Sequence, residues 1–378
     1  MIKVDPHIPR ILLVGGGTGG HVYPAIAIAD AVRELAPRAV IEFAGTMQRL
    51  EWRAVPQAGY AIHPIDVRGF RRTLSGETLT FPVMLTKALV QAWSLVKAFD
   101  PDVVVGTGGY VSGPVLWAAA KQGRPVLIQE QNAYPGVTNR LLGRYAQRIF
   151  VAFEEACAYF PADRCLLTGN PVRKELQQVD REEARAYWDI PAHAKVVLVF
   201  GGSLGSLALN QIMEQVTSVL LQDPEVFLLW QTGRRYFEGV QTRVASHARL
   251  KVFPYIQQMH YAYAAADLVI SRAGALTCSE LMVTGTPAVL VPSPHVAADH
   301  QTRNAQAMEA LGAARLLPES ALESRLLEMV QSLLQAPDVL AQMARAAREH
   351  AIPDAAERIA QEVLYWARSN QDWKGAAA

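Results

Sequence analysis

A glycine-rich loop set between an apolar run and a helical pattern constrains this fold more than any other feature. Apolar residues 11–14 lead directly into Gly-Gly-Gly-Thr-Gly-Gly at residues 15–20, and an alanine-rich helical pattern covers residues 25–33. Glycines let the backbone turn sharply and approach a ligand closely. The N–H groups and positive dipole end of the following helix suit a phosphate or diphosphate. The stretch therefore predicts a strand, a phosphate-binding loop and a helix.

The same loop also fits the dinucleotide fingerprint G-x-G-x-x-G at Gly15, Gly17 and Gly20. Glu42 lies near the position where a ribose-binding acid is expected. However, Glu42 sits inside an apolar strand pattern, and similar glycine loops occur later in the chain. An NAD-dependent oxidoreductase stays open as an alternative, and it predicts nicotinamide binding.

Length and charge narrow the class of protein. With 378 residues the chain is long enough for two domains, and its net charge of +1 argues against a general nucleic-acid binder. The first seven residues lack the apolar core of a secretory signal, so a cytosolic protein is expected. Residues 79–99 place Lys87, Gln91 and Ser94 on one side of a helix, which indicates an amphipathic helix packed on a sheet and not a membrane span.

The cysteines predict neither a disulfide nor a zinc site. Cys157, Cys165 and Cys278 are odd in number and lack C-x-x-C spacing, which is typical of a reducing compartment. The pair Asp100 and Asp102, between a helix and a strand, indicates a turn and not a Mg²⁺ site. No metal and no cofactor are expected.

The first part of the chain alternates strand-like and helical runs. Strand patterns occur at residues 40–44, 60–65, 103–106, 126–129 and 149–152, which predicts a parallel sheet with helices on both faces. A second glycine-rich loop covers residues 106–113, and a polar loop with Glu130 and Asn132 follows the next strand. Because ligands bind at the carboxyl ends of such strands, we expect all three loops to open onto one cleft.

A second α/β unit follows a turn at residues 168–173. Residues 195–206 repeat the order of strand, glycine loop and helix, and residues 271–282 form a third such segment. Further strands are expected at residues 226–230, 251–254, 267–271 and 287–291, and Asp180 is expected to cap a helix. The predicted domains are residues 1–170 and 171–353, with a last helix within 354–378 returning to the first domain and residues 370–378 frayed. Two such units suit an enzyme that holds two phosphorylated partners.

Five stretches, in this order, closely resemble one bacterial enzyme family: residues 15–25, 129–132, 169–173, 200–206 and 271–280. They are similar to the MurG family of N-acetylglucosaminyltransferases, which make lipid II from lipid I, and the resemblance covers nearly the whole chain. It implies an α/β fold of GT-B architecture, in which two Rossmann-like domains with parallel sheets face a deep cleft. It also implies catalysis without metal.

By this resemblance the chain moves GlcNAc from UDP-GlcNAc to the C4 hydroxyl of MurNAc in undecaprenyl-diphospho-MurNAc-pentapeptide, with inversion at the anomeric carbon. The product serves peptidoglycan synthesis and cell wall biogenesis, and with them cell shape, cell division and the cell cycle. Expected partners are UDP-GlcNAc, lipid I, an anionic membrane surface, and cell-wall synthesis and division proteins. The expected location is the cytoplasmic face of the inner membrane, as a peripheral protein. A GT-B transferase with another acceptor and a non-catalytic nucleotide-sugar-binding subunit stay open.

The resemblance also assigns roles in the second domain. It implies that Ser203 meets the donor diphosphate, that Glu280 binds the ribose hydroxyls, and that Gln301 contacts the GlcNAc hydroxyls, although the family often has two glutamines where this chain has His300 and Gln301. The remaining implied contacts are the Ile256 backbone with uracil, Arg173 with the donor, and helix-start N–H groups from Ala275, Leu276, Thr277, Cys278 and Ser279. A hinge salt bridge is the alternative role for Arg173.

In the first domain the resemblance places Thr18, Gly19, Gly20 and Asn132 against the acceptor diphosphate and the transferred sugar. His21 is the first candidate for the general base, because the positive end of a helix dipole favours the neutral imidazole. A purely structural histidine is the alternative, and Glu130 is the second candidate base. Residues 69–74 and 79–84 combine apolar side chains with Arg71 and Arg72, which is typical of a membrane-facing surface, although a loop and a buried helix fit as well.

Overall fold

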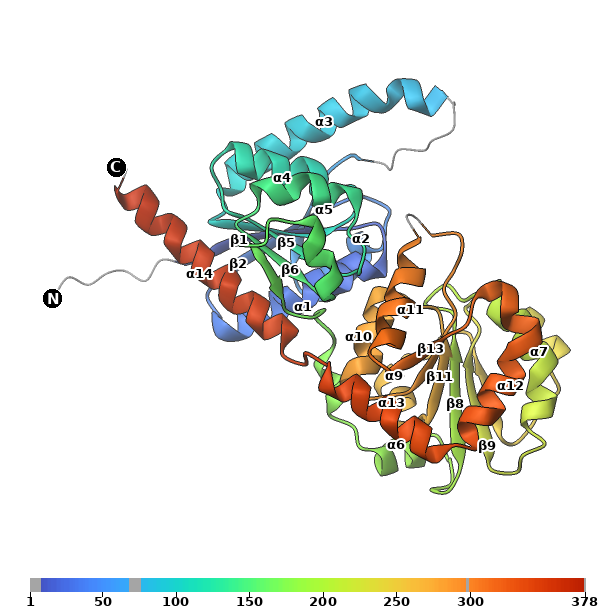
Figure 1. Cartoon of the computed structure of the whole chain (residues 1–378). Coiled ribbons are helices and arrows are strands. Elements are labelled where there is room, and N and C mark those ends of the chain that lie inside the picture. The colour runs from blue at the N-terminus through green and yellow to red at the C-terminus, as the bar shows by residue number, and fades with distance from the viewer. Residues whose placement is uncertain (1–7, 68–75, 297–298, 377–378) are drawn as a thin grey trace. The chain divides into compact units, whose positions relative to one another are not determined.

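The computed structural model describes residues 8–67, 76–296 and 299–376, and it divides the chain into two compact units (Figure 1). One unit contains Met1–Val172 and Pro353–Ala378, and the other contains Arg173–Ile352. Each has its own parallel sheet and its own core. The predicted fold class, two Rossmann-like α/β units, is confirmed.

The first unit is a parallel sheet with strand order β3-β2-β1-β4-β5-β6-β7 among its described residues. Its strands are β1 (Arg10–Gly15), β2 (Val40–Gly45), β3 (Ala61–Pro64), β4 (Val103–Gly108), β5 (Val126–Glu130), β6 (Arg148–Val151) and β7 (Cys165–Leu167). Its helices are α1 (Gly19–Leu35), α2 (Glu51–Gln57), α3 (Gly76–Phe99), α4 (Ser112–Lys121), α5 (Val137–Leu142), η1 (Gly143–Tyr145), η2 (Glu154–Tyr159) and α14 (Ala355–Ala376).

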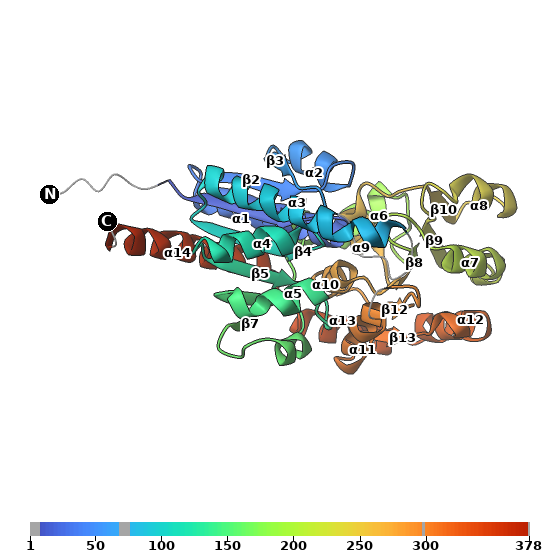
Figure 2. The same ribbon diagram turned by 90° about the horizontal axis from the view of Figure 1, so that it is seen from above.

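Alternation along each central strand builds the two cores of the first unit. Leu12 and Val14 of β1 face the core beneath α3 and α4, whereas Ile11 and Leu13 face the core beneath α1 and α14. Helices α3 and α4 lie side by side on the first face (Figures 1 and 2). Because both faces are covered, these strands bury apolar side chains on both faces, as expected for a parallel sheet.

Helix α14 comes from the far end of the sequence and packs against α1 in this first unit. Its Ile359, Val363 and Ala367 are buried in the core on that face, as the sequence periodicity indicated. The helix continues to Ala376, so the expectation that residues 370–378 fray was wrong over residues 370–376.

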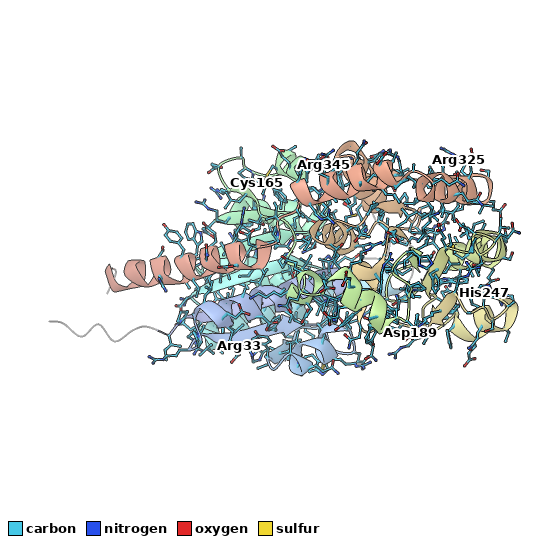
Figure 3. All side chains as sticks on the ribbon, turned by 90° about the horizontal axis from the view of Figure 1, so that it is seen from below. Arg33, Cys165, Asp189, His247, Arg325 and Arg345 are labelled. Atoms are coloured by element: carbon cyan, nitrogen blue, oxygen red, sulfur yellow. A yellow bond between two sulfur atoms is a disulfide. The ribbon has the colours of Figure 1, made fainter. Side chains whose placement is uncertain are left out.

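A disulfide joins Cys157 and Cys165, which corrects the expectation of no disulfide. Cys157 lies in η2, and Cys165, labelled in Figure 3, begins the short edge strand β7. The chain reversal between them leaves their Cα atoms 5.7 Å apart. That separation lies within the normal range for a disulfide. The third cysteine, Cys278, is buried and unpaired.

The second unit has the strand order β10-β9-β8-β11-β12-β13 among its described residues. Its strands are β8 (Lys195–Phe200), β9 (Val226–Gln231), β10 (Leu250–Phe253), β11 (Leu268–Ser271), β12 (Ala288–Leu290) and β13 (Ala314–Leu316). Its helices are η3 (Lys174–Gln177), α6 (Arg181–Tyr187), α7 (Leu207–Leu220), α8 (Phe237–Arg243), α9 (Met259–Ala265), α10 (Ala275–Thr284), α11 (His300–Ala310), η5 (Glu319–Ala321), α12 (Leu322–Leu334) and α13 (Pro337–Glu349).

Local signals set several boundaries. Asp180 caps α6 by accepting a hydrogen bond from Glu183 N–H (2.8 Å), as predicted. Asp102 accepts from Arg10 N–H (2.9 Å) and Asp100 pairs with Arg124, so these two acids shape a turn, as expected. Within the described ranges, no helix has the length and apolar character needed to cross a bilayer.

Candidate functional site

The loops of interest lie at the topological switch point of each sheet. In the first unit the strand order reverses between β1 and β4, and in the second it reverses between β8 and β11. The glycine loop after β1 and the loop after β4 flank the first point, and the loops after β8 and β11 flank the second. In open parallel sheets, ligands bind at the carboxyl ends of strands at such points.

In the first unit three loops are tied together. Thr107 Oγ1, near the end of β4, donates to His21 O (2.7 Å), which joins β4 to the start of α1. Gln131 Nε2 donates to Thr107 O (2.6 Å), which joins the loop after β5 to the end of β4. A Cβ on Gly109 would overlap the carbonyl oxygen of Gly16, so the two glycine loops require bare backbone where they meet. The three loops predicted to lie together therefore meet at one edge.

His21 lies in the first turn of α1 with its ring against the glycine loops. Its Nδ1 is 3.1 Å from Gly16 O and 3.3 Å from Thr18 Oγ1. A proton on Nδ1, donated to Gly16 O, places the imidazole lone pair on Nε2, because a neutral imidazole carries one N–H and one acceptor nitrogen. Gly108 packs against the Nε2 edge of the ring, with no room for a Cβ there. The geometry favours the tautomer that accepts a proton at Nε2.

Glu130, the second candidate base, accepts four hydrogen bonds from its own loop and from α5. Its Oε1 accepts from Asn132 N–H (3.0 Å) and Asn132 Nδ2 (3.1 Å). Its Oε2 accepts from Gly136 N–H (3.0 Å) and Asn139 Nδ2 (2.9 Å), and the side chain is buried. Both oxygens hold the β5–α5 loop in shape, so we expect Glu130 to position that loop, and its role as a base stays a prediction. Asn132 remains a candidate ligand, oriented by Glu130.

In the second unit the loop after β8 repeats this design. Gly202 O accepts from Gly205 N–H (3.1 Å), which closes a tight turn that leaves Ser203 exposed. Ser206 caps α7. Arg272, directly after β11, donates to Ser206 Oγ (2.7 Å) and to the carbonyl oxygens of Val291 and Pro292, and it also pairs with Glu319. Arg272 thus joins three loops, a role that its place in the sequence motif does not reveal.

Helix α10 presents only part of its predicted N–H set. Leu276 and Thr277 have no backbone acceptor for their N–H groups among the described residues, as is normal in a first helical turn. Cys278 N–H donates to Gly274 O (2.9 Å), and its thiol is fully buried. Burial raises the pKa of that thiol to about 12. Cys278 therefore offers no group to a ligand, which corrects that candidate, and Ser279 is also buried.

Glu280, one turn into α10, is the centre of a small polar group. Tyr263 Oη donates to Glu280 Oε2 (2.9 Å), and Arg173 Nη2 lies 3.8 Å from Glu280 Oε1. Burial raises the pKa of the Glu280 carboxyl above its ordinary value, while the Arg173 charge and the Tyr263 hydroxyl act in the opposite direction. Arg173 therefore contacts the proposed ribose-binding acid directly.

The raised pKa of Glu280 predicts pH-dependent binding of uridine, if this carboxylate holds the ribose hydroxyls. An ionised carboxylate accepts hydrogen bonds from both hydroxyls, and protonation removes an acceptor. Affinity is therefore present above the pKa of Glu280 and lost as the pH falls through it. Because the pKa of Glu280 is raised, uridine affinity begins to fall at a higher pH than it would for an ordinary glutamate. The pKa of an ordinary glutamate is about 4.3.

Calorimetric titration with uridine, which has no ionising phosphate, measures this pH dependence. Glu280→Gln is the matched variant, and its affinity should not change with pH over the same acidic range. A wild-type affinity that stays constant as the pH is lowered would contradict this role for Glu280.

Two further candidates keep only part of their polar surface for a ligand. Ile256 N–H donates to Gln231 Oε1 (2.8 Å), so the Ile256 carbonyl group is the backbone group that remains for uracil. Gln301 Oε1 accepts from Ser293 N–H (2.9 Å), which leaves its amide N–H groups. A cavity of about 640 Å³ lies at this edge of the second sheet. Asp299, which immediately precedes α11, and Thr302, in the first turn of α11, both line it.

The expected acid of the oxidoreductase alternative is engaged elsewhere. Glu42 Oε2 lies 2.5 Å from His63 Nε2 on the neighbouring strand β3. Its partner is thus a histidine of the edge strand. No cluster of three or more potential metal ligands occurs among the described residues.

Comparisons with known proteins decide the family. The N-terminal domain model of glycosyltransferase family 28 matches residues 11–151, and the C-terminal domain model of the same family matches residues 196–359. The chain belongs to glycosyltransferase family 28.

Family 28 relatives share nearly the whole chain. A UDP-N-acetylglucosamine–N-acetylmuramyl-(pentapeptide) pyrophosphoryl-undecaprenol N-acetylglucosamine transferase from Salinibacter ruber is 56% identical over 356 residues, which is 94% of this chain and 96% of the relative. The protein of the same name from Christiangramia forsetii is 44% identical over 356 residues, with 94% and 96% covered. This family membership excludes the oxidoreductase alternative.

A solved structure agrees with the family assignment. The crystal structure of Acinetobacter baumannii MurG is 32% identical, with a TM-score of 0.76, covering 94% of this chain and 99% of that chain. The GT-B fold class predicted from the sequence is confirmed.

Proposed function

We propose that this family 28 enzyme transfers GlcNAc from UDP-GlcNAc to the C4 hydroxyl of MurNAc in lipid I, which forms lipid II. The observation that carries the proposal is the 56% identity, over nearly the whole length, to a transferase named for this reaction. The loops at the switch point of each sheet support the proposal. Each of two phosphorylated substrates needs a phosphate-binding site made of backbone N–H groups at the start of a helix, and each unit has such loops.

The reaction makes one bond and breaks one. The C4 hydroxyl oxygen of MurNAc attacks C1 of GlcNAc, and the bond from C1 to the β-phosphate oxygen of UDP breaks, with its electron pair leaving on UDP. Attack from the face opposite the leaving group inverts the anomeric carbon. The hydroxyl proton passes to a base, for which His21 Nε2 is the proposed acceptor because of the tautomer that Gly16 O favours.

The second unit holds the donor in this proposal. Ser203 and the first-turn N–H groups of Leu276 and Thr277 meet the leaving diphosphate, and Glu280 binds the ribose hydroxyls, with Arg173 adding a positive charge. The Ile256 carbonyl accepts from uracil, and the amide N–H groups of Gln301 contact the GlcNAc hydroxyls. Ala275, which begins the helix, contributes through its backbone. In the first unit Thr18, Gly19, Gly20 and Asn132 face the acceptor.

The test is analysis of the product made from UDP-GlcNAc and a short-chain lipid I analogue. A disaccharide with a β linkage to C4 of MurNAc supports the proposal. Transfer only to a different lipid or small-molecule acceptor would instead indicate another reaction on the same donor site. Binding of UDP-GlcNAc without any turnover would indicate a nucleotide-sugar-binding subunit.

We also propose that the protein binds the cytoplasmic surface of the inner membrane, where a nucleotide-sugar donor and a lipid-linked acceptor meet. Apolar side chains on α3 support this: Val83 is 73% exposed, Val90 62% and Trp93 41%. Exposed Lys97 lies on the same helix, as does Lys87, which pairs with Asp66 (2.7 Å). Apolar groups beside cations suit an anionic bilayer. Arg71, Arg72 and residues 69–74 of the predicted patch lie outside the described residues.

The double variant Val90→Glu, Trp93→Glu is expected to reduce binding to phosphatidylglycerol vesicles at least about tenfold, because it removes two apolar side chains from the contact and adds negative charges that the anionic lipid repels. Vesicle flotation measures the bound fraction. Tyr365→Glu on α14, another exposed aromatic position of the same unit, is the matched control and should bind like wild type. Equal binding by the double variant would contradict the membrane role of α3.

A further inference from the structure

A buried carboxylate lies under the first glycine loop. Glu51, at the start of α2, is 0% exposed. Its Oε2 accepts from Gly17 N–H (3.0 Å) and its Oε1 accepts from Thr46 N–H (3.1 Å). No ion pair involving Glu51 forms among the described residues, so backbone N–H groups are its charge-stabilising partners.

Keeping an ionised carboxylate buried is costly unless its oxygens are hydrogen-bonded, so this arrangement is specific to the loop shape. Gly16 packs against the carboxylate so closely that a Cβ there would lie 2.5 Å from Glu51 Oε1. Gly16 O also lies 3.1 Å from Nδ1 of His21. Glu51 and His21 therefore contact the same two-residue segment, Gly16 and Gly17.

The contact also decides which loop N–H groups can meet a ligand. Because Gly17 N–H points inward to Glu51, it cannot face an anion in the loop. Gly19 and Gly20 have no backbone acceptor for their N–H groups within the described part of the chain. The anion-binding donors are thus those at the start of α1, and Glu51 fixes the turn that presents them.

We propose that Glu51 is a positioning residue for the acceptor. Its carboxylate locks Gly16 and Gly17, so that the Gly16 carbonyl orients the His21 ring and the start of α1 faces the acceptor diphosphate. This inference rests on the proposed transfer reaction.

The test is Glu51→Gln with separate kinetics for the two substrates. Glutamine has one acceptor oxygen and one NH₂ donor, so it can accept from only one of the two backbone groups, Gly17 N–H or Thr46 N–H. Its NH₂ group would then face the other N–H, donor against donor. The expected result is an acceptor kcat/KM lowered at least about tenfold, with the KM for UDP-GlcNAc unchanged. Calorimetry with UDP should give the wild-type affinity, since the donor loops belong to the other unit.

Asp102→Asn is the matched control. Asp102 is also buried in the first unit and accepts a backbone N–H, that of Arg10, but it lies where β4 begins, at the opposite edge of the sheet from the loops. Its removal should lower the melting temperature without changing the KM for the acceptor. If Glu51→Gln leaves the acceptor KM and kcat unchanged, or only lowers the melting temperature as Asp102→Asn does, the proposal is overturned.

Gly16→Ala is the second variant, should Glu51→Gln fail to fold. It keeps the charge and pushes the carboxylate away from the loop, so a smaller loss in the same acceptor-specific direction is expected, and unchanged acceptor kinetics would overturn the proposal. Hydrogen exchange tests the contact without turnover: the Gly17 and Thr46 amides should exchange slowly in wild type and rapidly in Glu51→Gln. If the wild-type Gly17 and Thr46 amides exchange slowly but the wild-type protein has no turnover, the transfer reaction is contradicted and the Glu51 contact is not. If these amides exchange rapidly in the wild-type protein, the positioning role of Glu51 is contradicted.

Discussion

Replacing His21 with alanine is expected to lower kcat about 100- to 10,000-fold, the usual effect of removing a general base. The lone pair at Nε2 accepts the proton of the attacking hydroxyl in this account, and the Gly16 carbonyl fixes the ring that carries it. The KM for UDP-GlcNAc should stay the same, because the donor loops lie in the second unit. Steady-state kinetics with saturating lipid I analogue measures both quantities.

Two comparisons separate catalysis from structure at His21. His21→Asn keeps a side-chain donor for Gly16 O but supplies no base, so it should lose as much kcat as His21→Ala. His63→Ala, which removes a histidine paired with Glu42 at the far side of the same sheet, should keep kcat within about twofold. If His21→Asn retains more than a tenth of the wild-type kcat, His21 is a structural histidine.

Replacing Gly205 with alanine is expected to destabilise the second unit by more than about 3 kcal/mol, as severe overpacking against backbone does. Gly205 has φ +77°, which disfavours any side chain. A Cβ there would also overlap the Thr232 carbonyl group and crowd Gly233 Cα, which are backbone atoms that cannot rotate away. Urea unfolding measures the change, and UDP should no longer raise the melting temperature.

Gly202→Ala, in the same loop, isolates the overlap. Gly202 has φ +86°, close to that of Gly205, but a Cβ there meets nothing within 4 Å. It should cost only the backbone strain, about 1–2 kcal/mol. Equal costs for the two variants would show that the turns after β8 and β9 are not packed as tightly as the structure has them.

Long apolar strands and glycine loops could be predicted from the sequence, because their signals are local. β1 and β8 are each a run of buried apolar residues that leads directly into a glycine turn, and the order of apolar residues and glycines predicts both strands. The edge strands β7 and β13 were missed, since each has three residues and two or more of these are partly exposed, which leaves no periodicity to detect.

The site was harder to predict wherever burial in three dimensions decides a role. Glu130 is a polar residue at the end of a strand, a position where a catalytic base is expected. Its four hydrogen-bond donors come together only in the folded chain, when the β5–α5 loop and α5 pack around it. Glu51 looks in sequence like an ordinary acid at a helix start, and its burial depends on a loop more than thirty positions earlier. The Cys157–Cys165 disulfide likewise depends on a chain reversal that spacing alone does not reveal.

The most direct test of the central claim is release of UDP from UDP-GlcNAc by the purified protein in excess EDTA, with and without a lipid I analogue. Acceptor-dependent release in EDTA is the predicted result, because the helix starts of the second unit and Arg173 supply the positive charge that the leaving diphosphate needs. Release that stops in EDTA, or that does not depend on the acceptor, would contradict the account.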